Sequence, residues 1–522
     1  MQTQPPHNRR TRARRGLAVG ALAATLLGGL LTGTAGTAVA APGHITWKPC
    51  TAPDGSRDFE CATLKVPVDH GKPKGATVSL ALNRHRATDP ARRIGPLLVN
   101  PGGPGGSGVD FVFGAKSTFS PGLLARFDIV GFDPRGVGRS DPATCDWDLV
   151  LRQDPLLYPG SAREFAGLRS ATHALARNCR ALTGPVLDHM GTDSVVRDMD
   201  AIRAALGEAK LSYYGVSYGT AIGQQYAARY PKRVRALALD SNMDHSLGRS
   251  AFQRTEALGV EEVYGQFADW CARTPACELH GRDARALFDS LYRRAEAGEL
   301  ELPGGLELKP QDVQLTVFGF LYDPASWYSL ADLLKDIDDP GADPVRLPAG
   351  FGEPAPYPVP AVMCQDYAFT VPSYAELARE KRDLARIAPV TRLSPLAWTT
   401  MTGCQNWPAK VTNPPRPLKV DGTPPILLTN SRHDPATPYA WGTNAARQIG
   451  KEAVLLTYDG VGHGDYWLSP CARDAIDTYL LTLKTPRPGT HCPAVWPTGP
   501  DARRQSAGPV NPLPELLGGA SY

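Results

Sequence analysis

Ser217 is the residue of this chain whose sequence context most favours nucleophilic chemistry. It lies in Gly-Val-Ser-Tyr-Gly, residues 215–219, between an apolar run at Leu211–Val216 and a helical pattern at Thr220–Tyr230. A serine at a strand-to-helix turn can present its hydroxyl above the edge of a sheet, and the flanking glycines let the backbone take the strained turn. We therefore predict that Ser217 is a nucleophile at the end of a strand.

His463 is the candidate base that would activate this hydroxyl. A serine hydroxyl is a weak nucleophile until an adjacent base takes its proton. Of the eleven histidines, only His463 is C-terminal to the serine and also lies in a glycine-flanked loop, Gly-Val-Gly-His-Gly, directly after an apolar run at Ala453–Tyr458. The sequence thus predicts that the imidazole reaches over the same sheet edge as Ser217.

A carboxylate is expected to orient the imidazole and to stabilise its protonated form. In the chain order serine, acid, histidine, this carboxylate lies between the other two residues. Asp434 is favoured because it follows the predicted strand Pro425–Asn430, which precedes the strand leading to the histidine. Asp240, after the predicted strand Val234–Leu239, is the rival candidate. Asp465 is too close to the histidine along the chain to be the expected orienting group.

Two backbone N–H groups are needed to hold the oxyanion of an acyl-transfer reaction. Tyr218, the residue after the nucleophile, is one expected donor. Gly103 is the other, since it lies in the glycine-rich segment 100–108, which follows a predicted strand. A phosphate-binding loop is disfavoured because this segment lacks the Gly-Lys-Ser/Thr end of such loops. A second glycine-rich segment, 133–140, is interpreted as a turn and ion-pair element beside the active-site loops.

Strands that alternate with helices must position these residues, which predicts an α/β fold with a mostly parallel sheet and helices on both faces. Residues 41–242 are predicted to form the first part of this core and 416–495 the second. Between them, 243–415 are dominated by helical patterns and predict an inserted, mainly helical cap. Further strands are expected at Val78–Asn83, Gly95–Asn100 and Phe127–Phe132, and helices at 194–206, 250–270, 283–297, 310–320, 327–337, 373–386 and 472–482.

Two segments are expected to be irregular. The Pro/Gly-rich stretch 339–360 predicts an irregular loop within the cap. The end of the chain, 496–522, is rich in Pro, Gly and Ser and is predicted to be loose.

The first 40 residues have the pattern of an export signal. Five arginines precede an uncharged, mostly apolar run at 16–31, and Ala-Val-Ala at 38–40 supplies small residues for cleavage. The run is short for a membrane span, so we expect a secreted, extracellular protein without stable membrane anchoring. Paired arginines make the twin-arginine route an alternative to general secretion. Removing five arginines from a chain of net charge +4 leaves −1, and no basic stripe with interleaved aromatics predicts nucleic-acid binding.

All ten cysteines lie after the predicted signal, and an even number in an exported chain favours disulfides. A metal site is disfavoured because the chain has no Cys-x-x-Cys pair and no clustered Cys/His spacing. Spacing alone leaves the connectivity open. Nearest-neighbour pairing would give Cys50–Cys61, Cys145–Cys179, Cys271–Cys277, Cys364–Cys404 and Cys471–Cys492.

Taken together, these motifs resemble the tripeptidyl and prolyl aminopeptidases of the α/β-hydrolase fold, especially exported enzymes of actinomycetes. The resemblance covers most of the mature chain and includes the segments at 100–108, 133–140 and 215–220, the Asp434 segment and Gly-His-Gly at 462–464. Pro101 stands where the intracellular prolyl enzymes have a histidine, a change that keeps the backbone donor of the loop.

The resemblance implies a secreted serine exopeptidase that acts on peptides or proteins with a free N-terminus and releases a short unit, a tripeptide. No metal or organic cofactor is implied. Such an enzyme needs an anion for the substrate's α-ammonium group, and Asp366 is the candidate. The alternatives are a secreted carboxylesterase or lipase with the same three residues, a prolyl aminopeptidase that releases single residues, and a binding protein without turnover. The sequence predicts no oligomeric state.

Overall fold

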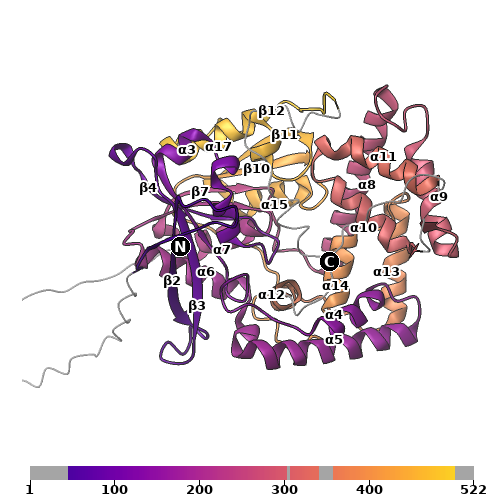
Figure 1. Ribbon diagram of the computed structural model, residues 1–522, viewed down its shortest axis with the longest axis horizontal. Helices are drawn as coiled ribbons and strands as arrows, with labels where there is room; N and C mark the ends of the chain where they lie inside the picture. Colours follow the sequence, from indigo (N-terminus) through magenta and orange to yellow (C-terminus); the bar gives the residue numbers. More distant parts are fainter. Residues whose placement is uncertain (1–44, 303–305, 340–356, 500–522) are drawn as a thin grey trace, which may run out of the picture. The chain divides into compact units, whose positions relative to one another are not determined.

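Ten of the strands form one sheet, which lies towards the left of Figure 1. The computed structural model describes residues 45–302, 306–339 and 357–499. The strands lie in the order β1-β2-β3-β5-β4-β6-β7-β10-β11-β12; β1, β2 and β3 pair antiparallel, β3 pairs antiparallel with β5, and the remaining pairs are parallel. Their bounds are β1 Lys48–Cys50, β2 Phe59–Pro67, β3 Thr77–His85, β4 Gly95–Asn100, β5 Phe127–Phe132, β6 Leu211–Val216, β7 Val234–Asp240, β10 Ile426–His433, β11 Ala453–Val461 and β12 His491–Cys492.

The parallel centre of the sheet is covered on both faces. Every residue of β4, β5 and β6 is buried, as expected where helices pack on both sides of a parallel sheet. Successive residues of a strand point to opposite faces, so neighbours in β4 enter different cores. Leu98 packs in one core with α6 (Thr192–Ala205), α7 (Tyr218–Arg229) and α15 (Tyr439–Ile449). Leu97 packs in the other core with α1 (Gly108–Phe113) and α17 (Pro470–Thr482).

Helices between β7 and β10 form a third hydrophobic core of their own. Its buried side chains come mainly from α8, α9, α10 and α11, which lie together in Figure 1. The helices of this region are α8 Arg249–Arg273, α9 Ala284–Ala297, α10 Pro310–Phe320, α11 Trp327–Asp338, α12 Pro358–Asp366, α13 Tyr374–Ile387 and α14 Pro395–Gly403. We call residues 243–415 the cap.

A helical segment that precedes β6 in the chain packs against the cap. It comprises α4 (Trp147–Gln153), a short 3₁₀ turn and α5 (Ala162–Thr183), and it meets the cap mainly through the 3₁₀ turn and α5. The indole N–H of Trp398 in α14 donates to the carbonyl of Leu157, 3.1 Å away, and the hydroxyl of Tyr374 in α13 donates to the carbonyl of Gly160. The helices of the cap and the α4–α5 segment, which come from separate parts of the chain, therefore pack together.

Most of the expected irregular loop at 339–360 lies outside the described residues, but its end differs from the prediction. α12 begins at Pro358, where a proline at the first helical position is tolerated because its missing N–H has no partner there. The predicted signal peptide, 1–40, also lies outside the described residues. Of the predicted loose tail, 496–522, only the first four residues are described.

Five disulfides cross-link the chain in the nearest-neighbour pairing that the spacing suggested. They are Cys50–Cys61, Cys145–Cys179, Cys271–Cys277, Cys364–Cys404 and Cys471–Cys492. The fourth of these links α12 to the residue after α14, within the cap.

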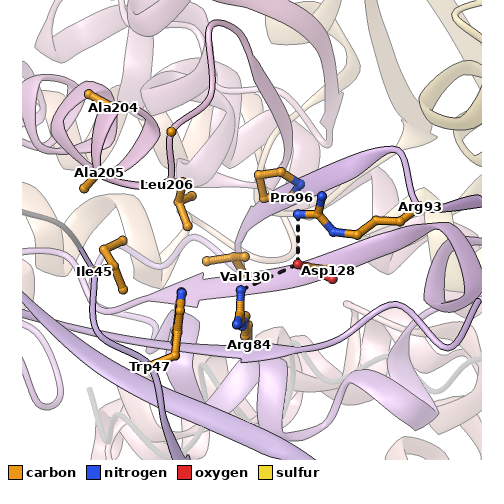
Figure 2. Close-up of a pocket in the computed structure, with 11 residues that line it drawn as sticks. Ile45, Trp47, Arg84, Arg93, Pro96, Asp128, Val130, Ala204, Ala205 and Leu206 are labelled. Carbon is orange, nitrogen blue, oxygen red and sulfur yellow. Dashed lines mark ion pairs between the residues drawn. The ribbon is translucent and has the colours of Figure 1, made fainter. Parts of the chain in front are cut away.

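A pocket at the edge where the parallel strands begin holds a compact ion cluster (Figure 2). Asp128, the second residue of β5, lies 2.9 Å from Arg93 and 3.7 Å from Arg84. The guanidinium of Arg84 also stacks over Trp47, 4.4 Å from the ring centre. Ser217 follows the carboxyl end of β6, so this cluster lies at the opposite edge of the sheet from the candidate nucleophile.

Candidate functional site

Ser217 occupies a strained turn between β6 and α7, the strand-to-helix position that its sequence predicts. Its backbone has a φ of 56° and a ψ of −125°, which L-residues with a side chain rarely adopt. The flanking glycines are needed here, because a Cβ on Gly215 would lie 2.7 Å from the carbonyl oxygen of Gly219. The N–H of Ser217 donates to the carbonyl of Asp240, 2.9 Å away at the end of β7. These contacts hold the serine above the carboxyl end of the sheet.

His463 and Asp434 are directly hydrogen-bonded and fully buried. Nδ1 of the imidazole lies 2.9 and 3.0 Å from the two carboxylate oxygens of Asp434. The carboxylate is itself fixed by the N–H groups of Ala436 and Thr437, at 2.9 and 2.8 Å, and by the Thr437 hydroxyl at 2.9 Å. With the Nδ1 proton donated to Asp434, Nε2 is the ring nitrogen that can accept a proton from an alcohol.

The other two carboxylates considered from the sequence are held by different donors. Asp240 accepts hydrogen bonds from the hydroxyls of Tyr214 and Thr429, at 2.9 and 3.0 Å, and from the N–H groups of residues 465 and 466. Burial raises the pKa of Asp240. Asp465 accepts a hydrogen bond from Ser431 at 2.7 Å, and burial together with the neighbouring Asp240 raises its pKa well above the ordinary range. Of the three carboxylates, Asp434 is therefore the one that accepts the hydrogen bond from Nδ1 of His463.

The glycine-rich segment 100–108 lies directly against the nucleophile turn. A Cβ on Gly102 would lie 2.5 Å from the carbonyl oxygen of Val216 and 2.9 Å from the backbone nitrogen of Tyr218. Gly102 and Gly103 both have positive φ, at 94° and 107°, so glycine is required by conformation as well as by space. Gly103 and Tyr218 line the same pocket as Ser217. The sequence identified this loop, although not the close contact of Gly102.

The pocket around Ser217 is enclosed mainly by apolar side chains of the cap and of the segments that flank it. Tyr322 is one of these cap residues, and its carbonyl accepts a hydrogen bond from the N–H of His463 at 2.9 Å. Its ring meets the imidazole edge-on, with the ring centres 5.2 Å apart. The cap thus contacts the histidine directly. The other apolar side chains that line the pocket include those of Met243, Phe252, Met363, Leu396 and Trp441.

Glu256 brings a buried carboxyl group into this apolar pocket. It lies on α8, its side chain is fully buried, and its Oε1 accepts a hydrogen bond from Ser394 at 2.9 Å. Its Oε2 has no hydrogen-bond partner among the described residues. Burial raises the pKa of Glu256 well above the ordinary range for a glutamate. Glu256 was not predicted from the sequence, although it lies one helical turn from Phe252 and from Val260, and this spacing places it on the buried face of the helix.

Asp366, expected to bind a substrate ammonium, lies in a buried network and is absent from the lining of this pocket. Its carboxylate accepts hydrogen bonds from the N–H and hydroxyl of Thr192, from the Asn413 amide and from the Tyr218 hydroxyl. The side chain is fully buried. Because these donors occupy both oxygens, the structure gives Asp366 no open face for a substrate ammonium. Glu256, in contrast, lines the pocket, and its Oε2 has no hydrogen-bond partner among the described residues.

The segment 133–140 has the structural character that the sequence suggested. Arg135 is fully buried and forms a two-pronged ion pair with Asp198, at 2.7 and 2.6 Å. Asp133 accepts hydrogen bonds from the Ser107 hydroxyl at 2.6 Å and from the N–H groups of Val109 and Arg139. The segment thus anchors the end of the glycine-rich loop, which contains Ser107.

Comparison with known proteins agrees with this geometry. Residues 95–311 match the family described as alpha/beta hydrolase fold, and residues 391–492 match the family described as TAP-like protein. The serine protease Hip1 of Mycobacterium tuberculosis is 33% identical over 86% of this chain and 91% of its own length. The tripeptidyl aminopeptidase of Streptomyces lividans is 31% identical over 85% of this chain and 86% of its own length.

A relative that is named for a different activity has a comparable similarity. Carboxylesterase B of Mycobacterium tuberculosis is 34% identical over 88% of this chain and 92% of its own length. Relatives of comparable similarity are thus named as peptidases and as a carboxylesterase. The chain belongs to the α/β-hydrolase family, in the group of serine hydrolases that includes these tripeptidyl-aminopeptidase-like enzymes.

Proposed function

We propose that the protein is a secreted serine exopeptidase that removes short peptides, tripeptides, from the free N-terminus of peptides or proteins. In this proposal Ser217 attacks the scissile carbonyl while His463 accepts the hydroxyl proton. The resulting oxyanion is held by the N–H groups of Tyr218 and Gly103. His463 then gives the proton to the leaving amine, and an acyl-enzyme ester remains on the serine.

Deacylation repeats this sequence with water. The imidazole takes a proton from the attacking water, the ester bond to Ser217 breaks, and the serine oxygen recovers the proton. Asp434 keeps the Nδ1 proton in place and stabilises the imidazolium in both halves of the reaction. The support for these roles is the direct contact between Asp434 and His463 and the position of Ser217 at a strained turn against the glycine-rich loop.

The buried carboxyl of Glu256 in the pocket around Ser217 favours a peptidase that acts on free N-termini over an esterase. A buried carboxyl with an oxygen that lacks a hydrogen-bond partner is costly in an apolar pocket unless a bound group compensates for it. The α-ammonium of a peptide N-terminus supplies both the opposite charge and the hydrogen-bond donor. An acyl chain of a simple ester supplies neither. The distance between this carboxylate and the serine then limits how many residues are released.

Export from the cell is part of the proposal. Residues 1–40 carry the signal pattern, and five disulfides are typical of proteins in oxidising compartments. Across the described ranges, no helix is long and apolar enough to span a membrane.

The test is a substrate panel with four members: a tripeptidyl 4-nitroanilide with a free amine, its N-acetylated form, an aminoacyl 4-nitroanilide and 4-nitrophenyl butyrate. We expect cleavage of the free tripeptidyl compound, at least a hundredfold loss on acetylation, and no activity in Ser217→Ala. Identification of the released peptide by mass spectrometry gives its length. Efficient cleavage of the butyrate ester without cleavage of any free-amine anilide would contradict the proposed function and favour an esterase.

A further inference from the structure

The carboxylate of Asp366 joins three other segments of the chain behind the nucleophile turn. It accepts hydrogen bonds from the Thr192 N–H at 3.0 Å and hydroxyl at 2.6 Å, from the Asn413 amide at 2.9 Å and from the Tyr218 hydroxyl. Its own backbone carbonyl lies 2.8 Å from Nε2 of His245. These partners belong to the start of α6, the start of α7, the end of the cap and the segment after β7. One buried side chain therefore ties the cap to both helices next to the nucleophile.

The donors around Asp366 are neutral groups. Thr192 is the first residue of α6, where the free N–H groups and the helix dipole favour a negative charge. A fully buried carboxylate is stable only while its hydrogen-bond donors stay in place, so the network resists displacement of any one of them. The hydroxyl of Tyr218 also lies 3.0 Å from the Thr192 hydroxyl, and both donate to the same oxygen of Asp366.

Tyr218 is the residue whose backbone N–H is proposed to bind the oxyanion, and its side chain ends in this network. Catalysis by such a donor depends on its direction being set before the reaction begins. We infer that Asp366 is a positioning residue for the oxyanion hole, which acts by holding the Tyr218 hydroxyl and thereby the orientation of the Tyr218 N–H. This inference rests on the proposed acyl transfer at Ser217. It does not depend on whether the acyl group is a peptide or an ester.

The same arrangement couples the cap to the oxyanion hole. Asp366 is the last residue of α12, and Met363 on the same helix lines the pocket around Ser217. The disulfide between Cys364 and Cys404 fixes this helix to the end of α14. One short helix thus provides both a wall of the substrate pocket and the contact that orients the oxyanion donor.

The experiment compares Tyr218→Phe, Asp366→Asn and the double variant in the full chain. Tyr218→Phe removes only the hydroxyl and keeps the backbone N–H, so it tests the inference even if Asp366→Asn fails to fold. We expect kcat to fall about tenfold to a hundredfold with KM within threefold, on both the tripeptidyl anilide and the butyrate ester. A peptidyl trifluoromethyl ketone, which forms an oxyanion on the serine, should bind more weakly by the same factor. The double variant should be no slower than the slower single variant.

Two matched controls separate positioning from stability. Tyr264→Phe removes another buried hydroxyl, which donates to the carbonyl of Ala284 at 2.7 Å within the cap. Asp128→Asn neutralises the buried carboxylate in the ion cluster at the opposite edge of the sheet (Figure 2). Both should lower the melting temperature and leave kcat within twofold.

Three results would overturn the inference. The first is a kcat of Tyr218→Phe within twofold of wild type, and the second is a change in KM alone in the single variants. The third is a loss of kcat in the double variant that equals the product of the losses in the two single variants. A wild-type protein that cleaves the ester but no peptide contradicts the proposed exopeptidase function instead. In that case the ester arm of the experiment still decides the role of Asp366.

Discussion

Replacing Glu256 by glutamine separates the charge of this residue from its shape. The substitution keeps the hydrogen bond from Ser394 and removes the group that can become a carboxylate in the pocket. Losing one partner of a buried ion pair costs about 3–5 kcal/mol, because the other charge is left uncompensated. We therefore expect kcat/KM for substrates with a free amine to fall roughly 10²- to 4 × 10³-fold, at about 1.4 kcal/mol per factor of ten.

The assay compares the free tripeptidyl anilide with the butyrate ester in both proteins. Since the ester has no ammonium, its kcat/KM should change by less than threefold in Glu256→Gln. Glu262→Gln is the matched control, because this residue lies on the same helix with a half-exposed carboxylate that pairs with His433. It should leave both substrates unaffected. An equal loss on both substrates in Glu256→Gln would refute the assignment of the ammonium site.

The pKa of Glu256 gives the same substitution a second, independent readout. Burial raises this pKa in the folded protein, so the folded state binds the carboxyl proton more tightly than the unfolded state does. For an acid shifted in this direction, stability is lost as the pH rises above the unfolded pKa. Glu256→Gln should therefore lose less thermal stability than wild type between pH 5 and pH 8. A steeper decline in the variant would contradict the burial argument.

Three further substitutions test the geometry of the site. Asp434→Asn should lower kcat by about 10³- to 10⁴-fold in steady-state assays, because the imidazole loses its orienting partner. An unchanged kcat in this variant, together with a loss of kcat in Asp240→Asn, would show that Asp240 is the orienting carboxylate. Gly102→Ala places a Cβ 2.5 Å from a carbonyl oxygen of the nucleophile turn, so fluorophosphonate labelling of the serine should be at least tenfold slower; labelling at the wild-type rate would show that the loop can move away. Replacing Cys364 and Cys404 by serine should lower stability by about 2–4 kcal/mol in denaturant titrations, and an unchanged midpoint would show that α12 is held by packing alone.

The main elements of the core could be predicted from local sequence because each carries its own signal. The runs Gly95–Asn100 and Phe127–Phe132 are observed as β4 and β5 with the predicted bounds. Ser217 and the glycine-rich loop were recognisable because a strained turn and a close backbone approach both require glycine, which the sequence shows directly. Chain order admits both Asp240 and Asp434. Asp434 could be chosen because it follows the strand just before the one that leads to His463.

What escaped prediction depends on contacts between distant parts of the chain. The strands at Lys48–Cys50 and Phe59–Pro67 have weak patterns of their own and are stabilised by antiparallel pairing at the edge of the sheet. The 22-residue helix α5 was not predicted, although it packs against the cap with a regular buried face. Asp366 was placed near the substrate by its position at the end of the cap, but only the fold shows that Thr192 and Asn413 enclose its carboxylate.

The carboxyl groups of Asp366 and Glu256, both in the cap, differ in their hydrogen-bond partners, and this difference explains their separate proposed roles. Asp366 is surrounded by donors from three other segments, so its charge is satisfied within the protein and its effect can only be to hold those donors in place. Glu256 has one donor, Ser394, and its other oxygen has no hydrogen-bond partner among the described residues, so a negative charge on this carboxyl is compensated only when a cation enters the pocket. A charged substrate end can thus be bound without disturbing the group that orients the oxyanion donor. If both carboxyls shared one network, Glu256→Gln would also slow the ester reaction, which makes that substrate the decisive measurement for both residues.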